Sequence, residues 1–113
     1  MISPVINTES IRIQEGGELP KGLYFYALTK LDMRGNESYP HVVQVYARYG
    51  GNIVSLSWKP DPMINEYRLY RGTSLSNLTG YFTIFDAGID EDDFLDFNDD
   101  GTGILNEFNT LQL

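Results

Sequence analysis

The residues best suited to chemistry lie in an acidic segment near the C-terminus, where their spacing matches an EF-hand calcium loop. Its hard oxygen ligands would be Asp96, Asn98, Asp100 and Glu107. Gly101 allows the sharp turn of such a loop, but the eighth position is Gly103 where an apolar residue is expected, and no amphipathic helix precedes the segment. We therefore expect a turn here and no cofactor, with a looser Ca²⁺ site as the alternative.

Two other features could support catalysis. The acidic run Asp90–Asp93 could hold paired carboxylates for glycoside hydrolysis, but contiguous acids in a loop are typical of a solvated surface. His41 is the only histidine and stands beside Pro40 at the start of an expected strand; a lone histidine is more often structural than catalytic, so a structural role is expected for it. The sequence therefore predicts a protein that is not an enzyme and has no catalytic residues.

Composition narrows the classes of partner. The 113 residues are enough for one domain with a real core, and the absence of cysteine excludes a disulfide scaffold or a thiolate metal site. The formal charge of −8 argues against nucleic acid, which attracts basic surfaces. No apolar run approaches the length of a membrane span, and no basic region followed by an apolar one opens the chain. We expect neither a membrane protein nor a Sec-type signal.

Alternation of apolar and polar residues predicts an all-β protein. The clearest stretch is Asn52–Gly72, which predicts two short strands around a turn at Asp61-Pro62 and places Trp58 and Tyr67 in the core. Further expected strands are Glu9–Gln14, Gly22–Leu31, Val43–Ala47 and Tyr81–Phe85, with breaks at Gly16-Gly17, Asp32–Ser38 and Tyr49–Asn52. About seven strands with turn signals at this spacing are typical of a β-sandwich or barrel.

Several of these stretches resemble a fibronectin type III domain, an immunoglobulin-like (Ig-like) β-sandwich. Leu19–Tyr26, with Asp32 and Gly35–Ser38, resembles the F strand and F–G loop; Val54–Trp58 resembles the B strand, Tyr67–Thr73 the C strand and Phe97–Gly101 a closing turn. In this reading Tyr24 is the corner tyrosine. Because the F- and G-like stretches come first, the resemblance implies a circularly permuted, seven-stranded sandwich at 1–103 and a C-terminal tail at 104–113.

The permuted arrangement is similar to modules in tail, fibre and other virion proteins of tailed bacteriophages. The resemblance implies a structural or interaction protein of a virion, made in the host cytoplasm: a capsid decoration or auxiliary protein, or a neck or tail accessory subunit. Its expected partners are other virion proteins, in a homo- or hetero-oligomeric assembly. The alternative is an adhesion module for carbohydrate or a host-surface glycan, assisted by Ca²⁺, which needs exposed Tyr46, Tyr70 or Trp58 as an aromatic platform.

Two apolar features remain once the sandwich core is assigned. The strand Gly22–Leu31 has a second apolar face, formed by Leu23, Phe25 and Ala27. The tail adds five large apolar residues, Ile104, Leu105, Phe108, Leu111 and Leu113. A monomer rarely exposes much contiguous apolar surface. Either the tail folds back over the second face, or the face and the tail dock onto a neighbouring subunit by strand addition or groove binding; the sequence leaves both open.

Overall fold

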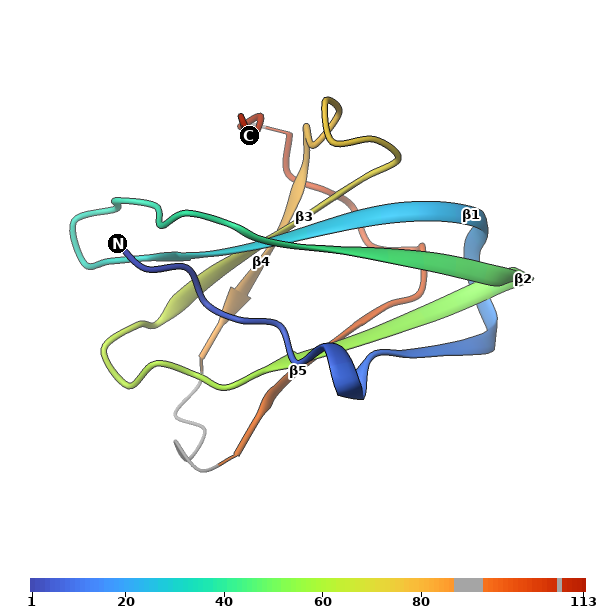
Figure 1. Cartoon of the computed structure of the whole chain (residues 1–113), viewed down its shortest axis with the longest axis horizontal. Coiled ribbons are helices and arrows are strands. Elements are labelled where there is room, and N and C mark those ends of the chain that lie inside the picture. The colour runs from blue at the N-terminus through green and yellow to red at the C-terminus, as the bar shows by residue number, and fades with distance from the viewer. Residues whose placement is uncertain (87–92, 108) are drawn as a thin grey trace.

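In the residues that the structure describes, the chain forms one antiparallel sheet of five strands, which confirms the predicted all-β class. The computed structural model describes residues 1–86, 93–107 and 109–113. The strands are β1 (Arg12–Leu31), β2 (His41–Trp58), β3 (Glu66–Gly72), β4 (Tyr81–Phe85) and β5 (Leu95–Asp99), preceded by a 3₁₀ turn at Thr8–Ser10. They lie in the order β4-β3-β1-β2-β5 (Figure 1).

β1 and β2 are long and bent, so the sheet curls around its main core. Both strands run along the long axis of the molecule and turn back at the end opposite the N-terminus (Figure 1). The buried apolar residues of β2 are Val43, Val45 and Ala47 before the bend and Val54, Leu56 and Trp58 after it, and all belong to one cluster. The first three residues stand at odd positions and the last three at even positions. Because side chains alternate between the two faces of a regular strand, both sets can reach one core only if the alternation is interrupted at the bend.

Two glycines and one buried asparagine make this bend. A Cβ at Gly17 would collide with the carbonyl of Asn52, and a Cβ at Gly51 would collide with the carbonyl of Gly17, so the two backbones touch there. Asn52 is completely buried; its side chain accepts a hydrogen bond from the Tyr49 N–H at 3.0 Å and donates to the carbonyls of Leu19 and Tyr49 at 3.0 and 2.8 Å. The amide thus replaces backbone partners that the bend removes.

The structure differs from the sequence prediction in how these stretches connect. The expected breaks at Gly16-Gly17 and Tyr49–Asn52 lie inside β1 and β2, so several predicted segments merge into longer strands. The two strands of Asn52–Gly72 do not pair with each other, because β2 pairs with β1 and β5 whereas β3 pairs with β1 and β4. Period-two alternation identifies a strand but does not name its partner.

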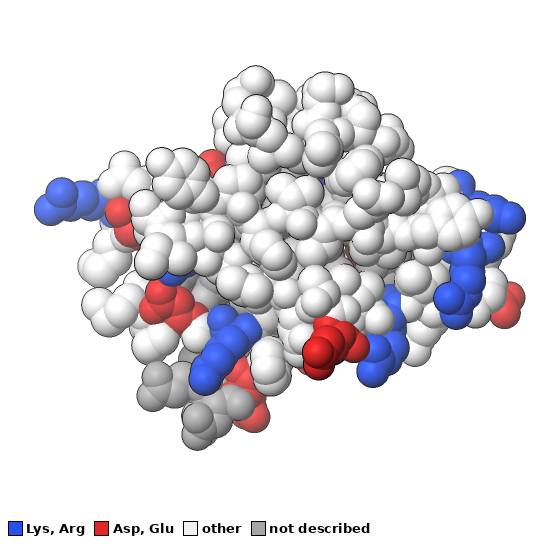
Figure 2. Space-filling model, in the orientation of Figure 1, with Lys and Arg blue, Asp and Glu red and all other residues white. Residues whose placement is uncertain are grey.

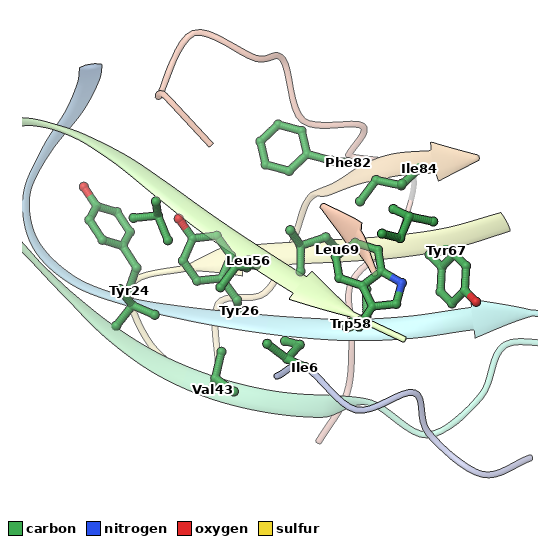
Figure 3. Close-up of a cluster of buried hydrophobic side chains, with 14 of the residues drawn as sticks. Ile6, Tyr24, Tyr26, Val43, Leu56, Trp58, Tyr67, Leu69, Phe82 and Ile84 are labelled. Carbon is green, nitrogen blue, oxygen red and sulfur yellow. The ribbon is translucent and has the colours of Figure 1, made fainter. Parts of the chain in front are cut away.

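The main core lies on the concave side of the curled sheet and contains the predicted centre. Trp58 of β2 and Tyr67 of β3 are both fully buried and face each other across it, with ring centroids 5.6 Å apart (Figure 3). Tyr24 and Tyr26 of β1 and Leu69 of β3 complete the same cluster. Trp58 and Tyr67 are therefore core residues, as the sequence indicated.

Candidate functional site

The opposite side of the sheet carries a second apolar cluster, which the C-terminal tail covers. This second face is built around Ala27, Tyr70, Leu78 and Tyr81, with Phe25, Val42 and Leu111 packed at its margin. The tail pairs with the outer edge of β4, since Tyr81 and Asn106 exchange two backbone hydrogen bonds of 3.0 and 2.9 Å. Farther along, the Leu111 N–H donates to the Leu78 carbonyl at 2.9 Å. In the single chain the tail thus folds back, which is the first of the two alternatives.

A polar network centred on Glu37 lies beside this cluster. One carboxylate oxygen accepts hydrogen bonds from the Thr29 hydroxyl at 2.6 Å and the Tyr70 hydroxyl at 2.7 Å, and the other pairs with the Arg68 guanidinium at 3.2 Å. The tail joins through Asn109, whose amide donates to the Tyr70 hydroxyl at 2.8 Å. The network therefore ties the loop after β1 to β3 and to the tail.

Burial sets the protonation of this network. Desolvation, followed by the hydrogen bond to Glu37, raises the pKa of Tyr70 to about 12, so its hydroxyl remains a donor at neutral pH. The Arg68 guanidinium also lies over the Tyr81 ring, 4.5 Å from its centroid, while its Nε atom is buried with no hydrogen-bond partner. These groups connect the tail to β3 and to the loop after β1.

The predicted interface residues fall into three groups. Phe25 and Leu111 pack at the margin of the second face, and Leu105 packs against the main core. Leu23, Ile104 and Leu113 are exposed to solvent, Ile104 almost completely at 94%. Phe108 lies outside the described residues. Docking of these residues onto a partner stays a prediction, since the structure contains a single chain.

A separate group of exposed apolar side chains, which was not predicted from the sequence, lies at the end of the molecule that carries the N-terminus. All three methionines of the chain, Met1, Met33 and Met63, line a shallow pocket of about 440 Å³ there, together with the Lys30–Asp61 ion pair. Met33 and Met63 are 94% and 76% exposed. We call this pocket and the exposed methionines around it the methionine end. The signal was present in the sequence, because both methionines stand in predicted turns, where an apolar side chain has no core to enter.

The residues of the EF-hand pattern, for which the sequence favours a turn, have other contacts in the structure. Asp96 and Asn98 lie on β5, which pairs with β2, and Asp100 uses one oxygen to accept hydrogen bonds from the N–H and hydroxyl of Thr102 at 2.9 and 2.6 Å. Both hydrogen bonds lower the pKa of Asp100, and the one from the Thr102 hydroxyl has the larger effect. Among the described residues no three His, Cys, Asp or Glu side chains are grouped to hold a metal. Of the acidic run Asp90–Asp93, only Asp93 is described.

The remaining candidates have structural surroundings. Trp58 and Tyr70 are fully buried, so Tyr46 is the only member of the expected aromatic platform that is exposed. His41 accepts a hydrogen bond at Nδ1 from the Ile6 N–H at 2.9 Å and thereby anchors the N-terminal segment. Ile6 itself is buried in the main core. The expectation of a structural histidine agrees with this contact.

Sequence reasoning also missed an ion pair inside the main core. Asp99 of β5 is 1% exposed; it accepts hydrogen bonds from the Arg71 guanidinium at 2.8 Å and the Tyr26 hydroxyl at 2.7 Å. Burial and the adjacent Asp99 charge raise the pKa of Tyr26. Asp99 was assigned to an acidic turn, and no local pattern distinguishes a buried aspartate from its exposed neighbours.

No protein-family model, curated protein or solved structure compared with the chain matches it. No helix in the described part of the chain is long and apolar enough to span a membrane.

Proposed function

We propose that the chain is a non-enzymatic structural and interaction module of a larger assembly, built as a circularly permuted fibronectin type III-like sandwich. The assembly we propose is a bacteriophage virion, on the strength of the sequence resemblance alone. The observation that carries the proposal of an interaction module is the methionine end, where large apolar side chains meet solvent.

The order of the strands supports the sandwich. Immunoglobulin-like sandwiches place strands A, B and E in one sheet and C, F and G in the other. Here the second half of β2, which resembles strand B, lies between the first half of β1 and β5. The second half of β1, which resembles strand F, lies between β3 and the first half of β2. Both neighbourhoods agree with the family arrangement.

Two local contacts support the permutation. The Tyr24 hydroxyl donates to the carbonyl of Pro20 at 2.7 Å, the bond expected of a corner tyrosine, which points back to the backbone a few residues upstream. The Glu18 N–H donates to the Asp100 carbonyl at 2.7 Å, so the end of β5 touches the start of the F-like segment. In an unpermuted domain the strand equivalent to β5 would continue at this point directly into the F strand.

The methionine end fits a docking role. Methionine is unbranched and polarizable, so a group of exposed methionines adapts to a partner's shape and gains apolar burial from it. The N-terminus and the loops that follow β1 and β2 lie together at this end (Figure 1). Docking through it leaves the second face covered by the tail and needs no rearrangement of the sheet.

Methionine footprinting on purified virions tests the proposal. Mass spectrometry first establishes whether the chain is present in the particle. Oxidation with dilute peroxide should then modify Met33 and Met63 rapidly in the free protein and at least about tenfold more slowly in the particle, because a docked thioether is shielded from the oxidant. Absence from the particle, or equal oxidation rates in both states, contradicts the proposal.

A matched pair of variants tests the surface itself. Met63→Glu places a charge in the proposed interface and should lower incorporation into the particle at least fivefold, because a buried unpaired charge is costly. Leu75→Glu changes a half-exposed apolar residue in the loop between β3 and β4 and should incorporate normally. If both variants incorporate like the unchanged protein, the docking surface lies elsewhere.

A further inference from the structure

The outer edge of β4 is only partly used by the tail. Tyr81 directs both of its backbone groups outward to Asn106. Backbone groups alternate in direction along a strand, so Thr83 and Phe85 also point theirs away from β3. Within the described residues, these outward backbone groups of Thr83 and Phe85 have no hydrogen-bond partner. The edge therefore presents open donors and acceptors directly after the tail's single pair.

A cleft lies alongside this open edge. It has a volume of about 420 Å³ and separates β4 from β5, the two outermost strands of the curled sheet. Phe82 and Phe97 line it, with ring centroids 4.9 Å apart, and the tail lines it through Ile104 and Asn106. Extended segments bind such edges by adding a strand, with backbone hydrogen bonds for affinity and side-chain contacts for specificity.

Charge indicates what kind of segment fits. Nine of the sixteen acidic residues and none of the eight basic residues come after Gly72 in the sequence. β4, β5 and the tail thus belong to the part of the chain that carries the negative charge. Figure 2 shows one face on which Lys and Arg lie at both ends of the long axis, including the end where β1 and β2 bend, and also along the lower edge between them. Of the carboxylates that line the cleft, Asp99 is paired with Arg71, while Asp100 contacts no basic group and its pKa is lowered.

We propose that the β4–β5 cleft binds an extended, basic polypeptide segment of a partner protein, which adds as a strand along Thr83–Phe85. This inference rests on the proposed interaction function and supplies a contact separate from the methionine end. A second copy of the tail is excluded as the occupant by its own charge, because the tail has an acidic residue, Glu107, and no basic one.

The test uses the full chain and two synthetic pentapeptides with blocked ends, one alternating lysine with valine and one alternating glutamate with valine. Backbone NMR should show that the lysine peptide shifts the amides of Thr83 and Phe85 and slows their hydrogen exchange. The glutamate peptide should bind at least tenfold more weakly, and added salt should weaken the lysine peptide. Equal binding of both peptides, or shifts confined to other strands, overturns the proposal.

Two pairs of variants separate the backbone from the charge. Thr83→Pro removes the outward N–H at an edge position where proline is tolerated and should weaken the lysine peptide at least tenfold, whereas Thr83→Val should bind within twofold. Asp100→Asn should weaken the peptide about threefold, and Glu15→Gln, on the first half of β1, should not. Unchanged far-ultraviolet circular dichroism shows that each variant is folded.

The peptide assay tests only the β4–β5 cleft, and the methionine footprinting tests only the proposed function, so either can fail without the other. A chain that binds no lysine peptide but protects Met63 in the particle retains the proposed function and loses only this inference. If Thr83→Pro binds the lysine peptide as well as the unchanged chain does, the strand-addition geometry is wrong.

Discussion

Two arginine–carboxylate–tyrosine groups lie on opposite sides of β3, and they differ in what they hold together. In the main core Arg71 pairs with Asp99 and Tyr26, which ties β3 to β5 and β1. On the second face Arg68 pairs with Glu37, and Tyr70 bonds the same carboxylate. Each guanidinium also lies over an aromatic ring, 5.5 Å from Phe82 and 4.5 Å from Tyr81.

The difference between the two groups is burial. The Asp99 side chain is 1% exposed, whereas that of Glu37 is 19% exposed and depends on the tail's Asn109 for part of its surroundings. Removing one partner of a buried ion pair is costly, because the other partner keeps a charge with little access to solvent. We therefore regard the core group as a fixed connection of β5 to β3 and β1, and the second-face group as the contact that holds the tail on the sheet.

The largest expected effect is in the core group. Asp99→Ala leaves the Arg71 guanidinium without its counter-ion and should lower the free energy of unfolding by about 3–5 kcal/mol, measured by urea denaturation. Asp96→Ala, on the exposed side of the same strand, is the control and should change it by less than about 0.5 kcal/mol. If Asp99→Ala costs no more than the control, the core pair is not a structural connection.

The second-face group should be less costly to break. Glu37→Ala removes the acceptor of Thr29 and Tyr70, but the Glu37 side chain is already partly exposed and Tyr70 keeps its hydrogen bond to Asn109, so we expect a loss of about 1–3 kcal/mol in the same measurement. Glu37→Gln keeps an oxygen acceptor and should recover part of that loss. A Glu37→Ala cost equal to that of Asp99→Ala would remove the distinction between the two groups.

The sequence predicted the class of fold and most of the core but not these two groups. Alternation around Trp58, Tyr67 and Tyr26 identified buried strand residues, because a strand with one buried face alternates apolar and polar residues. The residues that curl the sheet show no such periodic pattern. Gly51 and Asn52 were assigned to a turn because glycine and asparagine are typical of turns, and only the closeness of Gly17 in space gives them their role in the bend.

The candidate sites were harder to predict for the same reason. Glu37 and Asn109 are 72 positions apart and meet only once the tail crosses the second face. Met33 and Met63 are likewise brought together by two separate loops. Local pattern shows which residues could do chemistry, whereas a site is a property of long-range pairing that a single sequence does not record.

The tail supplies a third test of the comparison. The double variant Asn109→Ala/Leu111→Ala removes the amide that bonds Tyr70 and a half-buried apolar contact, so it should cost about 1–2 kcal/mol. Amide hydrogen exchange should accelerate in β3 on the second face and remain slow in the second half of β2. Leu113→Ala, an exposed residue of the same tail, should change neither quantity.

The last test distinguishes the two tyrosines by pH. Burial raises the pKa of both Tyr70 and Tyr26, so the folded state retains protons that the unfolded state loses near pH 10. Stability from each raised pKa is fully present below pH 10 and is lost as pH rises toward the folded value, by about 1.4 kcal/mol per pH unit for each tyrosine. Tyr70→Phe should reduce this decline up to pH about 12, and Tyr26→Phe should reduce it at least as much, because burial and the Asp99 charge both raise the pKa of Tyr26. Urea denaturation at half-unit steps from pH 9 checks both variants, and identical pH profiles would show that the two faces bury their hydroxyls equally.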